Sequence, residues 1–372
     1  MRVVHLAAYG GSYPGSFVPM LRAVDAGARA RGWSFEAVFT EDAARHPWYG
    51  DLAADEVAAR VAPPLSRRAL SAWVKDLVAE RPATSTVLHA HFTTFDLPAA
   101  AAARGRSEAI AVWHMHNPPE PSPAQVARGL LKFGLAGRSV DRILCVSRET
   151  ADVVRRRGAP HGRVVVFPNA IDLQRFLPPA DPSERARARA ALGIAAARPL
   201  LVHFGWDWPR KGGDLFLAAV EVLSKSKNDI LGMSVGGGEP ARSQIARLGL
   251  QDHARAIEPT DDVRTLYAAA DVFVAPSSSE GMPYAVLEAL CTGTPAVVSD
   301  IPSHAVLLDT PGCLAAQRDP AALAHAIASI LDARRGGPLR VDASRLVAGL
   351  DLKDWVERLL DIYAERLVPD RA

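Results

Sequence analysis

The chain has 372 residues, 49% of them hydrophobic and 23% charged, a composition that is typical of a folded globular protein and excludes extensive disorder. Its length exceeds the single core of roughly 100–200 residues that one domain usually builds, so two domains are expected. Lys and Arg (43) nearly balance Asp and Glu (41), and a net charge of +2 without a basic arm argues against a nucleic-acid partner.

The cysteines and the hydropathy pattern bear on the compartment. Cys145, Cys291 and Cys313 are far apart, odd in number and without a C-x-x-C pair, so buried, reduced thiols of a cytoplasmic protein are expected. The start, MRVVHLAAYGG, has too short an apolar run for a signal peptide. No stretch reaches the roughly 20 apolar residues of a membrane span. We therefore expect a cytoplasmic protein that is at most peripheral at the inner face of a membrane.

The first half alternates apolar β-type runs with segments of helical period. Residues 2–11 form such a run ending in glycines, and 17–32 follow with apolar positions at helical spacing. Further strands are predicted at 34–40, 85–92, 109–117, 141–147 and 163–169. This alternation predicts an α/β unit, a parallel sheet with helices on both faces.

A linker is predicted at 176–184, FLPPADPSE, because its prolines block regular structure. A second alternation follows it, with strands predicted at 199–205, 231–238, 254–259, 270–277 and 295–300. Its helices are predicted near 212–225, 239–249, 262–269, 283–292 and 320–332. The halves therefore predict two Rossmann-like domains. The last helix, 353–367, has an apolar stripe that we expect to dock on the first domain.

Two glycine loops follow predicted strands. In YGGSYPGSF, residues 9–17, Gly10, Gly11 and Gly15 precede a helix, where bare N–H groups can face an anion. The spacing is not G-x-G-x-x-G, so a dinucleotide site is not expected, and a plain tight turn is the alternative. VGGGEP, at 235–240, is a similar loop and a common one.

Two cations stand between a strand and a helix in HFGWDWPRKGGD, residues 203–214. Arg210 offers a fixed fork for two phosphate oxygens and Lys211 a mobile point charge, which together predict a diphosphate clamp. The alternative is a solvated basic turn. Trp206 and Trp208 are expected either to stack on a sugar ring or to pack between the domains.

Two carboxylates flank a turn in SSSEGMPYAVLEAL, residues 277–290. Pro283 suits the first helical position, which places Glu280 in the loop and Glu288 about a turn and a half inside the helix. Carboxylates accept hydrogen bonds from sugar hydroxyls, and a ribose diol matches one carboxylate. A metal pair is disfavoured because no clustered Asp or His accompanies them. Ordinary helix-surface acids are the alternative.

Histidine pairs end two predicted strands, His89 and His91 in LHAHF and His114 and His116 in VWHMHN. They lie at the sheet edge where ligands bind. A zinc site of four histidines lacks the acidic or Cys partners that usually accompany such a site. For His89 and His116 the alternative is a structural role in the core.

Together these segments resemble the retaining GT-B glycosyltransferases of family 4, or glycosyl transferases group 1. The resemblance spans almost the whole chain in order. It rests on YGGSYPG, HAHF, VWHMHN, CVSRETADVVRRRGAPHGRVVVFPNAID, RKGGD, VGGGEP and SSSEGMPYAVLEALCTGTPAVVSDIP. The E-x7-E spacing of Glu280 and Glu288 is the most specific part. After Glu280 the sequence has Gly-Met-Pro-Tyr where Gly-Phe-Gly is more frequent in the family.

The resemblance implies two Rossmann-like domains facing a central cleft, with the C-terminal helix returning to the N-terminal domain. Residues 1–176 with 354–372 are implied to bind the acceptor, and 177–353 the nucleotide sugar. The implied catalytic residues are His114, Arg210, Lys211 and Glu280. The implied donor-binding residues are Gly10, Gly11, Arg210, Lys211, Gly281, Met282, Pro283, Tyr284 and Glu288.

Within these sets the cations are implied to neutralise the diphosphate, Glu288 to bind the ribose and Glu280 to contact the transferred sugar. The implied reaction moves a hexose-type sugar from a UDP-sugar, or secondarily a GDP-sugar, to a hydroxyl of a glycan, lipid or secondary metabolite with retention (EC 2.4). No D-x-D motif is present, so neither a metal nor another cofactor is expected. The alternatives are a sugar phosphorylase on the same scaffold and a non-catalytic nucleotide-sugar-binding subunit.

The segment 125–140 mixes Arg128, Lys132 and Arg138 with leucines and a phenylalanine. Weak contact with an anionic membrane is one interpretation, and a first-domain helix with a solvated face is the other. The high Ala, Arg and Pro content suggests a GC-rich bacterial genome.

Overall fold

In a computed structural model the chain divides into two compact units. Unit 1 comprises residues 1–170 and 352–372, and unit 2 comprises residues 171–351. The structure describes residues 1–11, 14–64, 66–82, 84–178, 181, 183–226, 229–335, 339 and 341–367. The boundary expected at 176 lies a few residues after this division. Of the expected linker, Pro179, Ala180 and Pro182 lie outside the described residues.

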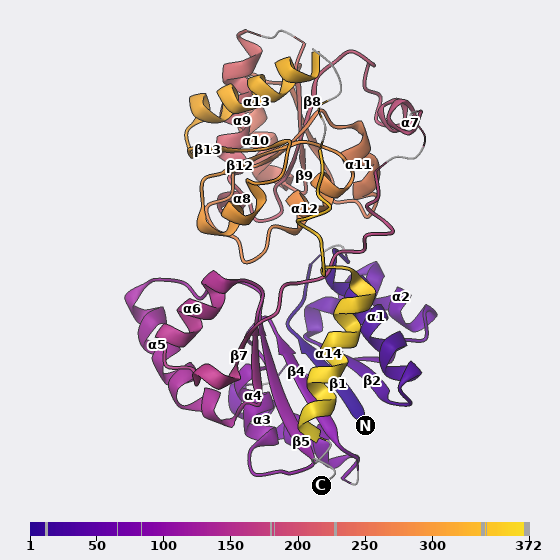
Figure 1. The fold of residues 1–372 in the computed structure, drawn as a ribbon, viewed down its shortest axis with the longest axis vertical. Coiled ribbons are helices and arrows are strands. Elements are labelled where there is room, and N and C mark those ends of the chain that lie inside the picture. Colours follow the sequence, from indigo (N-terminus) through magenta and orange to yellow (C-terminus); the bar gives the residue numbers. More distant parts are fainter. Residues whose placement is uncertain are drawn as a thin grey trace. The chain divides into compact units, whose positions relative to one another are not determined.

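Unit 1 contains a parallel sheet (Figure 1). Its strand order is β3-β2-β1-β4-β5-β6-β7. Its strands are β1 (Arg2–Ala7), β2 (Ser34–Phe39), β3 (Ala59–Val61), β4 (Thr86–His91), β5 (Ala109–Met115), β6 (Arg142–Cys145) and β7 (Val164–Val166). Its α-helices are α1 (Phe17–Ala30), α2 (Pro47–Ala54), α3 (Arg67–Ala79), α4 (Asp96–Ala103), α5 (Pro123–Gly134), α6 (Arg148–Arg156) and α14 (Leu352–Leu367).

The central strands of unit 1 are buried along their whole length, because helices cover both faces of the sheet. Alternate side chains enter different cores. Val4 packs with the helices α3 and α4, and Val3 packs with α1, α2 and α14. The apolar runs of the sequence were therefore a sound indication of two-sided burial.

Helix α14 docks on unit 1, as its apolar stripe predicted (Figure 1). The side chains of Trp355, Leu359 and Tyr363 are fully buried in the core shared with α1. The indole N–H of Trp355 donates to the carbonyl of Pro168 over 2.8 Å. The last helix is thus part of the unit that contains the first strand.

Unit 2 contains a second parallel sheet with the order β10-β9-β8-β11-β12-β13. Its strands are β8 (Leu200–Phe204), β9 (Leu231–Val235), β10 (Ala254–Ile257), β11 (Val272–Ala275), β12 (Ala296–Ser299) and β13 (Cys313–Ala316). Its α-helices are α7 (Glu184–Ala191), α8 (Trp208–Lys211), α9 (Gly213–Ser224), α10 (Gly238–Arg247), α11 (Val263–Ala269), α12 (Tyr284–Cys291) and α13 (Pro320–Arg335).

Each sheet has a point where the strand order reverses, between β1 and β4 in unit 1 and between β8 and β11 in unit 2. In doubly wound sheets, ligands bind outside the carboxyl ends of the strands at this point. His89, His91 and His114 lie in the carboxyl-terminal parts of β4 and β5, and His116 directly follows β5. The predicted cations and Glu280 follow β8 and β11. The topology thus places these residues at the edge of each sheet where ligands bind.

Two further expectations concern the surface and the thiols. Cys145, Cys291 and Cys313 are buried and unpaired, as predicted. Among the described residues, the helices are all too short or too polar to cross a bilayer. Exposed leucines line α5 and the residue after it, but the ammonium of Lys132 binds the buried carboxylate of Asp96. That cation therefore does not face outward with Arg128.

Candidate functional site

The loops after β8 and β11 are held together by a glycine. Gly212, between α8 and α9, adopts a φ of +70°. A Cβ built on it would lie 2.2 Å from the carbonyl oxygen of Pro276, in the loop after β11. Glycine is therefore required for both conformation and space. This close approach sets the cations that precede Gly212 against the segment that carries Glu280.

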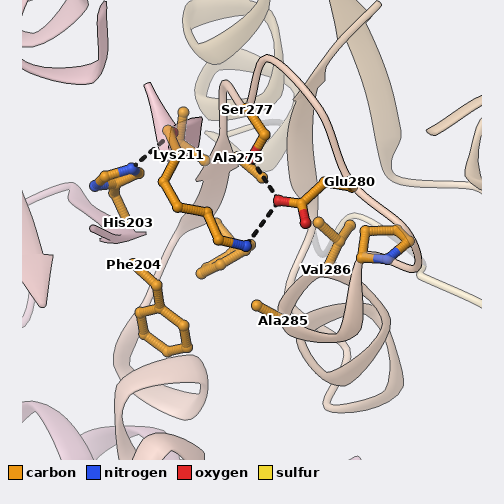
Figure 2. A pocket seen from close by; sticks show the side chains of 11 residues that line it. His203, Phe204, Lys211, Ala275, Ser277, Glu280, Ala285 and Val286 are labelled. Atoms are coloured by element: carbon orange, nitrogen blue, oxygen red, sulfur yellow. Dashed lines mark hydrogen bonds and ion pairs between the residues drawn. The ribbon is translucent and has the colours of Figure 1, made fainter. Parts of the chain in front are cut away.

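Glu280 joins both predicted cations in one buried cluster. Its side chain is only 7% exposed, and Lys211 Nζ lies 2.7 Å from Oε1 (Figure 2). Arg210 Nη1 lies 3.1 Å from Oε2. The hydroxyl of Ser277 also donates to Oε1 over 2.7 Å, as Figure 2 shows. The sequence predicted these three charged groups separately, and the fold brings them together as Glu280–Lys211–Arg210, here called the charge cluster.

The charge cluster keeps its carboxylate ionised. Burial opposes the charge of Glu280, but the positive charges of Lys211 and Arg210 and the hydrogen bonds from Lys211 and Ser277 outweigh it, so the pKa lies below the ordinary value. Burial also lowers the pKa of Lys211, and Glu280 offsets part of that effect. The cluster therefore carries one negative and two positive charges near neutral pH.

Arg210 is also fixed by its own loops. Its Nε donates to Asp207 Oδ2 over 2.6 Å, and its Nη1 donates to the carbonyl of Ser279 over 3.2 Å. The N–H of Ser278 donates to the carbonyl of Arg210 over 2.8 Å. Donor groups that are held by several partners lose little entropy on binding a ligand, which suits recognition of an anion.

A histidine that the sequence analysis did not single out supports the lysine. His203, at the end of β8, lines the same pocket as Lys211 and Glu280 (Figure 2). Its Nε2 lies 3.1 Å from the carbonyl oxygen of Lys211, and its Nδ1 lies 3.3 Å from the hydroxyl of Ser234. Burial lowers the pKa of His203 to about 4, so the ring is neutral. It positions the backbone of the lysine.

The two tryptophans have different environments. Trp208 is buried in the core of unit 2, and its indole N–H donates to Asp214 over 2.9 Å. Trp208 is therefore a core residue of unit 2. Trp206 is 41% exposed, and Lys211 Nζ lies 4.9 Å from the centre of its ring. Trp206 is the tryptophan that lies beside the charge cluster.

Glu288 lies apart from the charge cluster, in α12. The phenol of Tyr267, from α11, donates to its Oε2 over 2.9 Å. Burial raises the pKa of Glu288 to about 7, although Tyr267 and the charge of Arg175 act in the opposite direction. The two glutamates of the motif therefore differ in protonation near neutral pH.

The turn between the glutamates differs slightly from the prediction. Pro283 was expected at the first helical position, but its ψ of 69° is not helical and it caps α12, which begins at Tyr284. Gly281 and Pro283 are buried, and Met282 and Tyr284 are partly buried. The N–H groups of Val286 and Leu287 both donate to the carbonyl of Pro283. The helix start moves by one residue for this reason.

A second unpredicted histidine lies near Glu280. His304, in the short helix η4 (Pro302–Leu307), is 1% exposed and its Nδ1 lies 2.8 Å from the carbonyl oxygen of Ser299. Its Nε2 has no hydrogen-bond partner among the described residues. Burial lowers its pKa, and the charge of Glu280 partly offsets this. An isolated histidine after a short strand has no sequence signal that marks it.

The residues predicted from the first half belong to unit 1. The carbonyl of Gly10 is 3.1 Å from His46 Nε2, and the carbonyl of Gly11 accepts from the indole of Trp48 over 2.8 Å. Ser12 and Tyr13 of the same predicted loop lie outside the described residues. His114 is 1% exposed, and neither of its ring nitrogens has a hydrogen-bond partner among the described residues.

The chain is similar to known glycosyltransferases in sequence. Residues 28–175 match the family described as Glycosyltransferase Family 4, and residues 198–333 match Glycosyl transferases group 1. The lipopolysaccharide core biosynthesis mannosyltransferase LpsB of Rhizobium meliloti is 30% identical over 60% of this chain and 70% of its own. D-inositol 3-phosphate glycosyltransferase 2 of Catenulispora acidiphila is 33% identical over 52% of this chain and 49% of its own. The chain spans about half the length of several such relatives.

The chain is also similar in fold to solved structures. Anabaena HepE in complex with UDP-glucose superposes with a TM-score of 0.82 at 19% identity, over 98% of this chain and 100% of that one. WaaG, a glycosyltransferase involved in lipopolysaccharide biosynthesis, superposes with a TM-score of 0.72 at 19% identity, over 97% and 99%. With its two parallel Rossmann-like sheets and returning helix, the chain has the GT-B fold and belongs to glycosyltransferase family 4, the glycosyl transferases group 1.

Proposed function

We propose that the protein is a retaining hexosyltransferase that takes a sugar from a nucleoside-diphosphate donor and transfers it to a hydroxyl acceptor. The observation that carries the proposal is the buried charge cluster, in which Glu280 pairs with both Lys211 and Arg210 at the carboxyl ends of β8 and β11. Two fixed cations at the point where the strand order of a Rossmann-like sheet reverses are suited to binding a diphosphate. Membership of family 4 supports the same reaction class.

In this proposal the donor rearranges the charge cluster. The diphosphate brings negative charge to Lys211 and Arg210, which releases oxygen atoms of Glu280 to accept hydrogen bonds from sugar hydroxyls. As the bond to the sugar breaks, charge grows on the diphosphate, and cations already in place stabilise it without reorganisation. Because these side chains supply the positive charge, we propose that no divalent cation is required.

The ribose is assigned to Glu288. An ionised carboxylate accepts two hydroxyl hydrogen bonds, so a vicinal diol is a matched partner. The pKa of about 7 means that the ligand-free carboxyl group is partly protonated at neutral pH. Donor binding is therefore expected to release part of a proton at pH 7, which calorimetry in buffers of different ionisation enthalpy measures.

A UDP-sugar is the favoured donor and a GDP-sugar the second choice, since the similar HepE structure is a complex with UDP-glucose. The acceptor is proposed to be a hydroxyl of a glycan, a lipid or a secondary metabolite. Among the relatives, the name of LpsB indicates a glycan acceptor, and the name of the D-inositol 3-phosphate glycosyltransferases indicates a small-molecule acceptor. In unit 1, His114 is proposed to contact the reacting sugar, and the loop at Gly10 and Gly11 is proposed to contact the diphosphate.

The test is donor turnover by the full chain. We expect hydrolysis of a UDP-sugar, or transfer from it, in the presence of EDTA. We also expect NMR to show that the transfer product has the anomeric configuration of the donor. Arg210→Ala and Lys211→Ala are expected to lower kcat by about 100-fold, as loss of one preorganised charge does in other enzymes. Arg242→Ala, which removes an exposed ion-paired arginine on α10, is the control. Wild-type turnover in both cation variants, or phosphate-dependent sugar release without a nucleotide, contradicts the proposal.

A further inference from the structure

Five histidines and one tyrosine form a continuous buried cluster in unit 1. His5, His89, His91, His114 and His116 lie at the carboxyl ends of β1, β4 and β5 or directly after them. The strand register pairs His5 with His89 and His91 with His114. Their side chains share the face of the sheet that α1 and α14 cover, since they occupy alternate positions of their strands.

Three of these rings, those of His91, His114 and His116, have nitrogen atoms close to one another. The ligand atoms of His91, His114 and His116 all lie within 4.8 Å of one another. His91 Nδ1 and His116 Nε2 are 2.9 Å apart. Two imidazoles on a tetrahedral zinc ion have nitrogens about 3.3 Å apart, given zinc–nitrogen bonds of about 2.0–2.1 Å. His91 and His116 therefore need to move apart by a few tenths of an ångström, and an ion would replace the hydrogen bond between them. Any pair near the 4.8 Å limit needs to move closer.

His114 provides an independent observation. Its side chain is almost completely buried, and both Nδ1 and Nε2 lack a hydrogen-bond partner among the described residues. A buried polar atom without a partner is costly, and each such group in a native protein calls for a cause. A cation bound to one nitrogen of His114 satisfies that atom.

The protonation states suit a cation. Burial, together with the neighbouring imidazoles, holds the pKa of His91 and His114 well below the ordinary value. Burial lowers the pKa of His116 to about 3. A metal ion requires the lone pair of a neutral imidazole, and the direction of these shifts favours that form.

A chain of hydrogen bonds orients the ring of His91 through its second nitrogen. His91 Nε2 is 3.1 Å from His5 Nδ1, and His5 Nε2 is 3.0 Å from the hydroxyl of Tyr363. The same hydroxyl is hydrogen-bonded to His89 Nδ1. Ligating histidines in proteins are usually oriented in this way through their second nitrogen. His5, His89 and His91 also lie close enough to hold an ion, but all three are buried, whereas His116 is partly exposed.

We propose that His91, His114 and His116 form a binding site for one Zn²⁺ ion, with the fourth position open to water. Three imidazoles favour zinc and its neighbours in the first transition row over Mg²⁺ or Ca²⁺, which prefer oxygen ligands. The proposal concerns three histidines of unit 1, of which His114 is also assigned to the proposed transfer reaction, and the zinc titration does not depend on that reaction.

The experiment uses the full chain, stripped with a chelator and titrated with Zn²⁺ against a chromophoric competitor. We expect one equivalent to bind, and Co²⁺ in its place to give the intense visible bands of tetrahedral coordination. His116→Ala is expected to weaken Zn²⁺ binding by at least about 100-fold, and His5→Phe, which removes the supporting hydrogen bond, by about 10–100-fold. His325→Ala, an exposed histidine on α13, is the matched control and binds Zn²⁺ as the wild type does.

Two results overturn the assignment. Binding below one equivalent in the wild type means that the rings are only a packed stack. Unchanged affinity in His116→Ala, with binding lost in His89→Ala, places the ion at the deeper histidines instead. Circular dichroism and thermal unfolding of the metal-free variants show whether each is folded, and His116→Gln replaces His116→Ala if that variant does not fold.

Discussion

The Glu280 carboxylate lies 2.7 Å from the ammonium of Lys211, although the two residues are 69 positions apart in the chain. Lys211 ends the short helix α8 after β8 and Glu280 lies in the loop after β11, and Gly212 approaches that loop closely. The pair is buried, so its energetics differ from those of a surface ion pair.

Removing the carboxylate alone is expected to destabilise the protein. Glu280→Ala leaves Lys211 buried without its partner, which costs about 3 kcal/mol of the free energy of unfolding. The double variant Glu280→Ala/Lys211→Met is expected to recover most of this loss, because the buried ammonium is gone and Arg210 keeps its ion pair with Asp207. Urea unfolding followed by circular dichroism measures both. A double variant no more stable than Glu280→Ala contradicts the account.

The same pair predicts a pH dependence. The pKa of Glu280 in the folded protein lies below its ordinary value, so its contribution to stability is present above the unfolded pKa and is lost as the pH falls. Wild-type stability is therefore expected to fall more steeply than that of Glu280→Gln between pH 5 and the acid transition. Parallel curves for the two proteins contradict the assignment.

Glu288 is expected to behave in the opposite sense. Its pKa rises to about 7 on folding, so its protonation stabilises the folded state at low pH and this contribution is lost as the pH rises through 7. Glu288→Gln, which stays neutral, is expected to be more stable than wild type at pH 8 by on the order of 1–3 kcal/mol. Near pH 4 the difference is expected to vanish. Denaturant titrations at both pH values decide this, and an equal difference at both contradicts it.

The ribose assignment predicts a specific loss of discrimination. Wild type is expected to bind UDP more tightly than 2′-deoxy-UDP by about 10-fold or more, because a hydroxyl bonded to a charged group is worth about 1.5–3 kcal/mol. Glu288→Ala is expected to bind both nucleotides equally, at the weaker affinity. Isothermal titration calorimetry measures the ratio. A preference for UDP that survives in Glu288→Ala places the ribose elsewhere.

Gly212 is expected to tolerate no side chain. Gly212→Ala combines a strained φ with a Cβ only 2.2 Å from a backbone oxygen, so the loops must separate. Gly249→Ala is the matched control, since its φ of +66° is similar but nothing lies within 4 Å of the added carbon. We expect the control to lose about 1–2 kcal/mol of stability from the backbone strain and Gly212→Ala clearly more. Equal losses contradict a role for the close approach.

The sequence determined the order of the elements and the chemistry of the motif residues. Long apolar runs fully covered by helices, such as β1, β4 and β5, carry a clear signal, and so does the apolar stripe of α14. The three-residue β3 and the small-residue β13 carry none, because neither holds a long apolar run. The resemblance to family 4 also rested on motif residues that the chain presents in order.

The partners of those residues were decided only by the tertiary structure. In the sequence Glu280 and Glu288 are two similar acids, but Glu280 meets cations from another loop and Glu288 meets Tyr267 from α11. Their pKa values move in opposite directions for that reason. Likewise, alternate positions place His89 and His91 on one face, but only the strand order brings His5 beside them and only α14 adds Tyr363. Local pattern specifies which way a side chain points, whereas burial and charge depend on segments far away in the chain.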